Sequence, residues 1–344
     1  MKRLFLILVL FLLLLPIAGC TVESQKEIMD KIAILEGVSM QRGVNMGNAL
    51  EAPKEGEWGV VIKDEYFKLI KEAGFDHVRI PIKWSAHTEA KPPYKISEEF
   101  FDRVDHVINE SLKQELITII NIHHYDEIMQ NPRGEKEKFL SIWKQISERY
   151  KDYPETLFFE ILNEPNGNLT PDIWNEFLAE ALKVIRVTNP DRVVLVGTAE
   201  WGGISSISKL KIPKEEKNIL VTVHYYNPFY FTHQGAEWAS GSEQWLGTKW
   251  HGSWAEKQQV ISDFNIAEEW SKENRRPIHI GEFGAYSKAD MESRVRWTSF
   301  VAREAERRGW PWTYWEFCSG FGVYDPVKNE WRKELLEALI PIDK

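Results

Sequence analysis

Positive charge is scarce in this 344-residue sequence, which has 43 lysine and arginine residues against 52 aspartate and glutamate residues and a formal charge of −9. Nucleic-acid binding requires a basic face, so this deficit argues against a nucleic-acid partner. Long apolar runs are missing too, since the longest, residues 4–15, is shorter than the roughly 20 residues of a membrane-spanning helix. No linker rich in proline, glycine and serine and no repeat of solenoid period divides the chain, which indicates one domain.

The short apolar run belongs to a predicted processing segment. Lys2 and Arg3 precede it, and residues 17–20, Ile-Ala-Gly-Cys, end it. A basic start, an apolar centre and small residues before the cleavage point are typical of a secretory signal peptide, and the last four residues resemble a bacterial lipobox. We therefore expect residues 1–19 to be removed, and the protein to be secreted and held at the outer face of the cell membrane by lipid on Cys20. An uncleaved anchor is the alternative.

Cysteine is scarce as well, because Cys318 is the only one besides Cys20. With Cys20 acylated, no disulfide bond can form within the chain, so the mature fold has to be stabilised by its core. A predicted linker of residues 20–36 leads into a predicted domain of residues 37–344. That length is sufficient for a core, because one α/β barrel commonly occupies about 250 residues.

The predicted domain alternates between strand and helix patterns. The predicted strands are residues 43–48, 77–81, 116–123, 157–163, 192–197, 219–225, 277–282 and 312–317. Predicted helices between them include residues 64–73, 100–113, 138–150, 171–187 and 293–308. Eight strands suit a closed barrel, so the sequence predicts the α/β class and a single (β/α)8 TIM barrel. A doubly wound open sheet is the alternative, although no glycine-rich phosphate loop follows the first strand.

Two glutamates stand at the ends of apolar runs that are typical of buried parallel strands. Glu164 lies in the Asn-Glu-Pro of residues 163–165, and Glu282 lies in the Gly-Glu-Phe-Gly of residues 281–284. The carboxyl ends of the strands of a parallel barrel share one mouth, where both carboxylates would then lie. The alternative is two separately solvated loop glutamates, because glutamate is mostly exposed in proteins.

Other predicted strands also end in polar or amphipathic side chains on this rim. They supply Arg79, His123, His124, Asn163, His224, Tyr226, Trp315 and Glu316. Two carboxylic acids that face each other at one mouth can cleave a glycosidic bond, provided that their pKa values are pushed apart. Arg79 is the cation available on the rim to favour the ionised form of one of them. His224 and Tyr226 are two residues apart on a strand, so they share one side and can each attend one acid.

The rim also has many aromatic neighbours. The predicted loops contain or adjoin Trp201, Trp238, Trp245, Trp250 and Trp254, and the longest connection is predicted over residues 227–257. Burial explains most large aromatic side chains, but a flat ring in a loop can also stack on the apolar face of a sugar. A loop of this length in a compact domain is more often functional than not.

Residues 43–324 resemble glycoside hydrolase family 5, whose members are retaining (β/α)8 enzymes. The family has an arginine after strand two, a histidine after strand three, Asn-Glu on strand four, His-x-Tyr on strand six, a glutamate on strand seven and a tryptophan on strand eight. Those positions are filled by Arg79, His123 or His124, Asn163 with Glu164, His224 with Tyr226, Glu282 and Trp315. No departure from the family pattern is visible.

The resemblance implies a role for each of these residues. Glu164 is implied as general acid/base and Glu282 as nucleophile, with Arg79 and Tyr226 attending Glu282, His224 attending Glu164, and Asn163 holding the sugar 2-hydroxyl. A retaining mechanism predicts carboxyl groups about 5–5.5 Å apart, whereas an inverting pair would be about 6.5–9.5 Å apart. Neither a metal nor another cofactor is implied.

Residues 43–51 and 231–238 resemble, more narrowly, the thermophilic endoglucanases of this family, some of which also cut mannan. This implies that Asn48 and Glu51 bind the non-reducing side of the cleft, and that Trp201 and Trp238 line the cleft. The expected substrate is a β-linked polysaccharide or oligosaccharide, with β-1,4-glucan preferred and mannan as a second substrate. An enzyme whose main activity is endo-β-mannanase is an alternative.

Two further alternatives come from different classes of protein. A metal-dependent barrel hydrolase could use His123, His124, Asp126 and His224. Adjacent residues of a strand point to opposite faces, however, and no H-E-x-x-H spacing is present. A lipid-anchored glycan-binding protein would explain the signal peptide and the aromatic loops, but it would have no use for a proton donor paired with a nucleophile.

Overall fold

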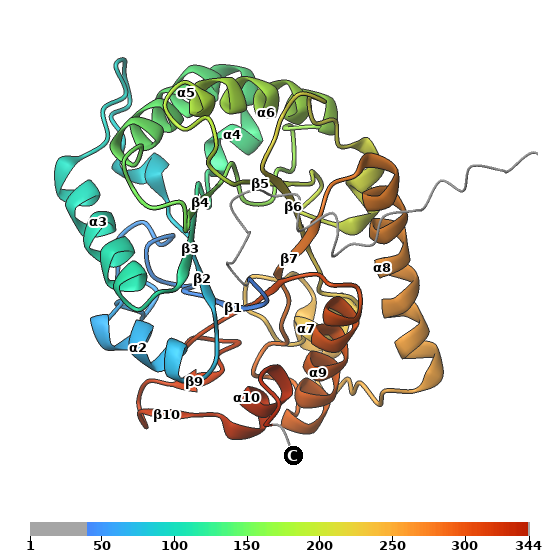
Figure 1. The fold of residues 1–344 in the computed structure, drawn as a ribbon. Coiled ribbons are helices and arrows are strands. Elements are labelled where there is room, and N and C mark those ends of the chain that lie inside the picture. Colours follow the sequence, from blue (N-terminus) through green and yellow to red (C-terminus); the bar gives the residue numbers. More distant parts are fainter. Residues whose placement is uncertain (1–39, 343–344) are drawn as a thin grey trace, which may run out of the picture.

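The computed structural model describes residues 40–342, which form a closed barrel of parallel strands surrounded by helices (Figure 1). Its strands are β1 (Arg42–Asn45), β2 (His77–Ile80), β3 (Ile117–Asn121), β4 (Leu157–Glu160), β5 (Val194–Gly197), β6 (Ile219–His224), β7 (Ile278–Glu282) and β8 (Trp312–Tyr314). Each strand pairs with the next one along the chain, and β8 pairs with β1. The predicted (β/α)8 barrel is confirmed, and the doubly wound open sheet is wrong.

Long helices follow most strands and cover the outside of the barrel. They are α2 (Asp64–Glu72), α3 (Glu98–Lys113), α5 (Pro132–Arg149), α6 (Pro171–Arg186), α8 (Trp254–Asn274), α9 (Met291–Arg307) and α10 (Lys333–Leu339). The connections contain the short helices η2 (Trp84–His87), α4 (Asp126–Gln130), η3 (Ile204–Lys209), α7 (Phe229–Thr232) and η4 (Ser242–Trp245), and the two-stranded sheet of β9 (Tyr324–Asp325) and β10 (Glu330–Trp331).

Capping residues explain where two of the helices begin. Helix α5 begins at Pro132, before the predicted 138, since the Asn131 side chain accepts a hydrogen bond from the backbone of Gly134 and proline is favoured in the first turn. Helix α8 begins at Trp254, because Ser253 and Glu256 form a capping box. The long connection after β6 therefore ends before the predicted residue 257.

The inside of the barrel is divided between apolar and polar side chains. One part is an apolar cluster of Met40, Ile117, Ile119, Phe158, Val193, Leu195 and Leu220. In the other part, the Thr313 hydroxyl lies 2.8 Å from a ring nitrogen of both His77 and His279, and Thr222 lies 3.1 Å from the other ring nitrogen of His279. Gly43 leaves the room for His77, because a Cβ at residue 43 would lie 2.1 Å from that ring.

The predicted signal peptide of residues 1–19 and linker of residues 20–36 lie outside the described residues. Of the two cysteines, Cys318 is described and is a buried free thiol. Among residues 40–342, none of the helices combines the length and the apolar character needed to cross a bilayer.

The buried imidazole of His279 makes the stability of the barrel depend on pH. Burial lowers the pKa of His279 well below 6.5, and the nearby charges of His77 and Arg79 lower it further. Below about pH 6.5 the unfolded chain binds a proton that the folded protein does not bind, so the free energy of unfolding falls on acidification.

We predict that His279→Gln reduces the slope of the unfolding free energy against pH, by up to about 1.4 kcal/mol per pH unit between about pH 7 and pH 5. Urea unfolding followed by tryptophan fluorescence at several pH values measures this slope. The comparison uses slopes, so a constant loss of stability in the variant does not affect it. Equal slopes in the variant and the original protein would contradict the prediction.

Candidate active site

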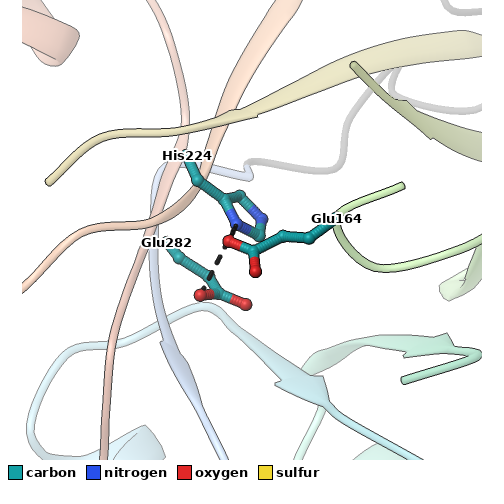
Figure 2. A group of neighbouring side chains, drawn as sticks. All are labelled: Glu164, His224 and Glu282. Atoms are coloured by element: carbon teal, nitrogen blue, oxygen red, sulfur yellow. Dashed lines mark hydrogen bonds and ion pairs between the residues drawn. The ribbon is translucent and has the colours of Figure 1, made fainter. Parts of the chain in front are cut away.

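The structure brings the two glutamates of the rim motifs together at one mouth of the barrel, with a histidine between them (Figure 2). Glu164 follows β4, His224 ends β6 and Glu282 ends β7. The Nδ1 atom of His224 lies 2.7 Å from Oε1 of Glu164 and 3.5 Å from Oε2 of Glu282. One oxygen of each carboxylate and this nitrogen all lie within 4.8 Å of one another. Two carboxylates this close can act on the same bond.

The guanidinium of Arg79 is fully buried beneath this pair and joins several strands. Its Nη1 donates to Oε1 of Glu282 and to Oδ1 of Asn45, both at 2.8 Å. Its Nη2 donates to Oδ1 of Asn163 at 2.7 Å and to Oε1 of Glu160 at 2.8 Å, and its Nε donates to Oε2 of Glu160. Arg79 therefore orients the Glu282 carboxylate and the Asn163 side chain together.

The environment of Glu282 opposes the cost of its burial. Burial is the largest influence and raises the pKa of Glu282, the charges of His224 and Arg79 and a hydrogen bond from Tyr226 lower it, and the charge of Glu164 raises it, so that the pKa stays above its ordinary value. That bond runs from the Tyr226 hydroxyl to Oε2 at 3.0 Å. Both oxygens of Glu282 thus accept a bond from a fixed donor, which favours the ionised form that a nucleophile needs.

His224 is held so that its ring faces both carboxylates. Burial by itself would lower the pKa of His224, but the negative charges of Glu282 and Glu164 outweigh burial, and the pKa is raised. The backbone N–H of His224 donates to the carbonyl of Gly202 at 2.8 Å. Gly202 has a φ of +69°, and a Cβ there would lie 3.1 Å from the His224 ring, so glycine allows this close approach.

The mouth opens into a cavity of about 1030 Å³ that contains both glutamates. All but one of the other residues predicted for the site line it or lie beneath it: Asn48, Arg79, His123, His124, Asn163, Trp201, His224, Tyr226, Trp238 and Trp315. Trp201 and Trp238 are each 62% exposed, so their rings are free to contact a ligand in the cavity. Trp250, in contrast, is buried against Phe300, which agrees with the packing explanation for that residue.

Both histidines after β3 line the cavity, so the two candidates for the family position are close together. His123 is buried and stacks on Trp315 with a ring separation of 5.9 Å, and burial lowers its pKa well below the usual range. His124 packs edge-on against Trp58 at 5.4 Å. Trp58, which did not stand out in the sequence, is thereby part of the cavity wall.

Glu51 does not line the cavity, in contrast to the role that the resemblance implies for it. The residue is fully buried, and its carboxylate accepts hydrogen bonds from the backbone N–H groups of Asn48 and Ala49. Burial raises the pKa of Glu51 to about 8, although these backbone donors act in the opposite direction. In this structure Glu51 shapes the turn that presents Asn48, and it does not reach the cavity itself.

The site predicted from the sequence did not include Glu160 and Asn45, which both accept hydrogen bonds from the guanidinium of Arg79. Both are fully or almost fully buried. A signal for Glu160 was present, because a glutamate inside the apolar run Phe-Phe-Glu-Ile-Leu of residues 158–162 has to be compensated by a buried cation. Asn45 gave no comparable signal.

The metal-dependent alternative is not supported by the placement of its residues. Within the described part of the chain, one group of histidine, cysteine, aspartate and glutamate side chains is compact enough to share an ion: Glu164, His224 and Glu282. The other residues of that alternative lie outside this group: His123, His124 and Asp126. A cation next to Glu282 would also be repelled by the Arg79 guanidinium, which lies 2.8 Å from its carboxylate.

Comparisons with known proteins agree with this geometry. Residues 35–320 match the family model described as Cellulase (glycosyl hydrolase family 5). Endoglucanase H of Acetivibrio thermocellus is 38% identical over 90% of this chain, and Cellulase/esterase CelE of the same organism is 32% identical over 84%. The chain spans only 32% and 36% of the lengths of these two relatives.

Similar solved structures cover the barrel almost completely. Thermotoga maritima Cel5A in complex with mannotriose is 63% identical, with a TM-score of 0.87, and the alignment covers 91% of this chain and 99% of that one. The same enzyme with cellobiose is 65% identical, with a TM-score of 0.87 and coverage of 90% and 99%. The resemblance inferred from the rim motifs is confirmed: the chain belongs to glycosyl hydrolase family 5.

Proposed function

We propose that this protein is a retaining endo-β-1,4-glucanase that cleaves cellulose-type chains by double displacement. The observation that carries the proposal is the distance of at most 4.8 Å between carboxylate oxygens of Glu164 and Glu282. An inverting pair needs about 6.5–9.5 Å to admit a water molecule beside the sugar, whereas a retaining pair is about 5–5.5 Å apart. The endoglucanase names of related proteins support the same activity.

In the first step, the Glu282 carboxylate attacks the anomeric carbon while Glu164 donates its proton to the departing glycosidic oxygen. The carbon–oxygen bond to the leaving chain breaks, and an ester forms between the sugar and Glu282. Glu282 suits this role because Arg79 and Tyr226 fix both of its oxygens. Glu164 suits proton donation because its side chain is 26% exposed, against 6% for Glu282, and so it faces the incoming substrate.

In the second step, Glu164 removes a proton from water, which attacks the same carbon and releases Glu282. Two inversions give net retention of configuration. His224 keeps the Glu164 carboxyl in position for both proton transfers through its 2.7 Å contact. Asn163, held by Arg79, lies beside the reacting sugar, where its side chain can bind the 2-hydroxyl. The two glutamates and one water molecule account for every proton and electron pair in these two steps.

Mannan is the second candidate substrate. It is favoured by the complex of Thermotoga maritima Cel5A with mannotriose, because that enzyme is 63% identical to this chain. The cellobiose complex of the same enzyme favours glucan. We place glucan first because the related proteins are called endoglucanases. A main activity as endo-β-mannanase would appear directly as a higher kcat/KM on mannan than on glucan.

We also propose that the protein is exported and attached to the outer face of the cell membrane by lipid on Cys20. The support is the pattern of residues 2–20 alone. Such an anchor would place the hydrolase next to polymeric substrates that cannot enter the cell.

The catalytic assignment is tested with Glu282→Gln and Glu164→Gln on cellulose, mixed-linkage glucan, mannan and xyloglucan. Both variants are expected to lose at least about 100-fold in kcat, because general acid–base catalysis alone contributes about 10²–10⁴-fold. Binding of oligosaccharides, measured by calorimetry, is expected to persist. Release of reducing ends at the original rate by both variants would show that Glu164 and Glu282 are not the catalytic pair, whereas a glycan-binding protein would release none even before substitution. Proton NMR of the first product should show the β-anomer.

We predict that Glu160 influences the pH at which kcat/KM falls on the acid side, because its negative charge partly cancels the positive charge of Arg79. Glu160→Gln leaves the Arg79 charge uncompensated beside Glu282, which lowers the pKa of Glu282. We expect the acid limb of kcat/KM to move down by about 0.5–1 pH unit. A matched control is Glu304→Gln, which also removes a buried, arginine-paired carboxylate, here bound to Arg308 at 2.7 Å in the outer layer. A uniform loss of rate without a shifted limb would contradict this role.

Lipid attachment is tested by expression of the full chain in a bacterium supplied with labelled palmitate. The original protein should incorporate label and sediment with membranes, and Cys20→Ser should do neither. Cys318→Ser is the control, because Cys318 is buried in the described barrel. Labelling that survives Cys20→Ser would contradict the lipobox assignment.

A further inference from the structure

The cavity continues beyond the reacting residues into a space between η3 and α8. We call this space the α8 groove and define it by Trp201, Ser205, Asn227, Asp263 and Ile266, which line the same cavity as the two glutamates. Asp263 and Ile266 are three residues apart on α8, so they present the same face of that helix. The chemistry of bond cleavage derived above uses neither of these two side chains.

The α8 groove lies on the Glu164 side of the cleavage point. The backbone N–H of Trp201 donates to the carbonyl of Pro165, the residue after Glu164, at 3.3 Å. Asn48, Trp58 and Trp315 line the cavity beside the residues after β3, since Trp58 packs against His124 and Trp315 stacks on His123. Glu164 protonates the departing oxygen, so a chain that leaves past Glu164 enters the groove.

Asp263 provides a carboxylate that is suited to binding hydroxyl groups. Its Oδ2 accepts bonds from the Tyr225 hydroxyl at 2.9 Å and the Asn227 amide at 3.2 Å, and its Oδ1 accepts one from Gln259 at 2.8 Å. These partners are all uncharged. Among the described residues Oδ1 accepts this one bond, so a second lone pair is available to a ligand. An ionised acceptor forms stronger hydrogen bonds than a neutral one.

Apolar surface faces the same space. Trp201 is 62% exposed and Ile266 is 47% exposed. A carboxylate beside an exposed ring and an aliphatic side chain matches a sugar unit, which has hydroxyl groups at its edge and apolar C–H groups on its faces.

We propose that the α8 groove binds the reducing-end portion of the glycan, the part released when the bond breaks. Asp263 accepts hydrogen bonds from sugar hydroxyls, and Ile266 and Trp201 contact the faces of the rings. This inference rests on the proposed glycosidase function and extends it, because it makes helix α8 a determinant of where a long chain is cut. A leaving group too short to enter the groove gains nothing from these residues.

The test compares two substrates that use the groove differently. Cellohexaose can extend into it, whereas an aryl cellobioside has only a small aromatic leaving group at that point. We expect Asp263→Ala to lower kcat/KM on cellohexaose by about tenfold more than on the aryl cellobioside, as for a lost hydrogen bond to a charged group. Ile266→Ser, at an exposed position, should act in the same direction. Cleavage of end-labelled cellohexaose should shift towards bonds nearer its reducing end.

Two controls separate binding from support of the fold. Tyr225→Phe removes a bond to Asp263 but keeps the carboxylate, and Ser262→Ala changes an exposed α8 position outside the groove. An equal loss on both substrates in Asp263→Ala, reproduced by Tyr225→Phe, would overturn the inference, as would unchanged kinetics of Ile266→Ser together with an unchanged cleavage pattern. If the original protein cleaved neither substrate, the proposed function would fail, and this inference with it.

Discussion

The active site depends on one buried cation, the guanidinium of Arg79. It has no exposure to water, so its charge has to be compensated by the residues around it, and Glu160 and Glu282 do this from two different strands. Loss of one partner of a buried ion pair typically costs about 3–5 kcal/mol, so these side chains hold one another in place. The same interaction that stabilises the centre of the barrel thereby orients the nucleophile before any substrate arrives.

The closed barrel gives this interaction its geometry. Strands β4 and β7 are more than 100 residues apart in the chain, yet their carboxyl ends lie on one rim, because all eight strands are parallel and β8 pairs with β1. The loops and helices beyond the strands then extend the rim into a cavity. The turn of Asn48, the loop of Trp201 and helix α8 all contribute to its lining. The residues that cleave the bond therefore come from the strand ends, and much of the remaining cavity lining comes from the loops and helices that follow them.

Sequence reasoning succeeded where the pattern was local. Short apolar runs predicted all eight strands, and glycine and Asn-Pro stops predicted several helix ends, since both depend on neighbouring residues alone. It did not foresee that Glu51, three residues after Asn48 in the motif, turns inwards to the backbone, and it overlooked Glu160 inside an apolar run. Adjacency in the chain does not say which side chains face water and which face a buried arginine.

The sequence by itself determined the alternation of strands and helices, the two glutamates at the ends of strands, and the family resemblance, because these follow from residue types at short spacing. Only the tertiary structure decided that Glu164 and Glu282 approach within 4.8 Å, that Glu160 and Asn45 support Arg79, and that Asp263 borders the cavity. The reason is physical: distances between side chains on different strands depend on strand register, barrel closure and rotamers, and none of these can be read from neighbouring residues.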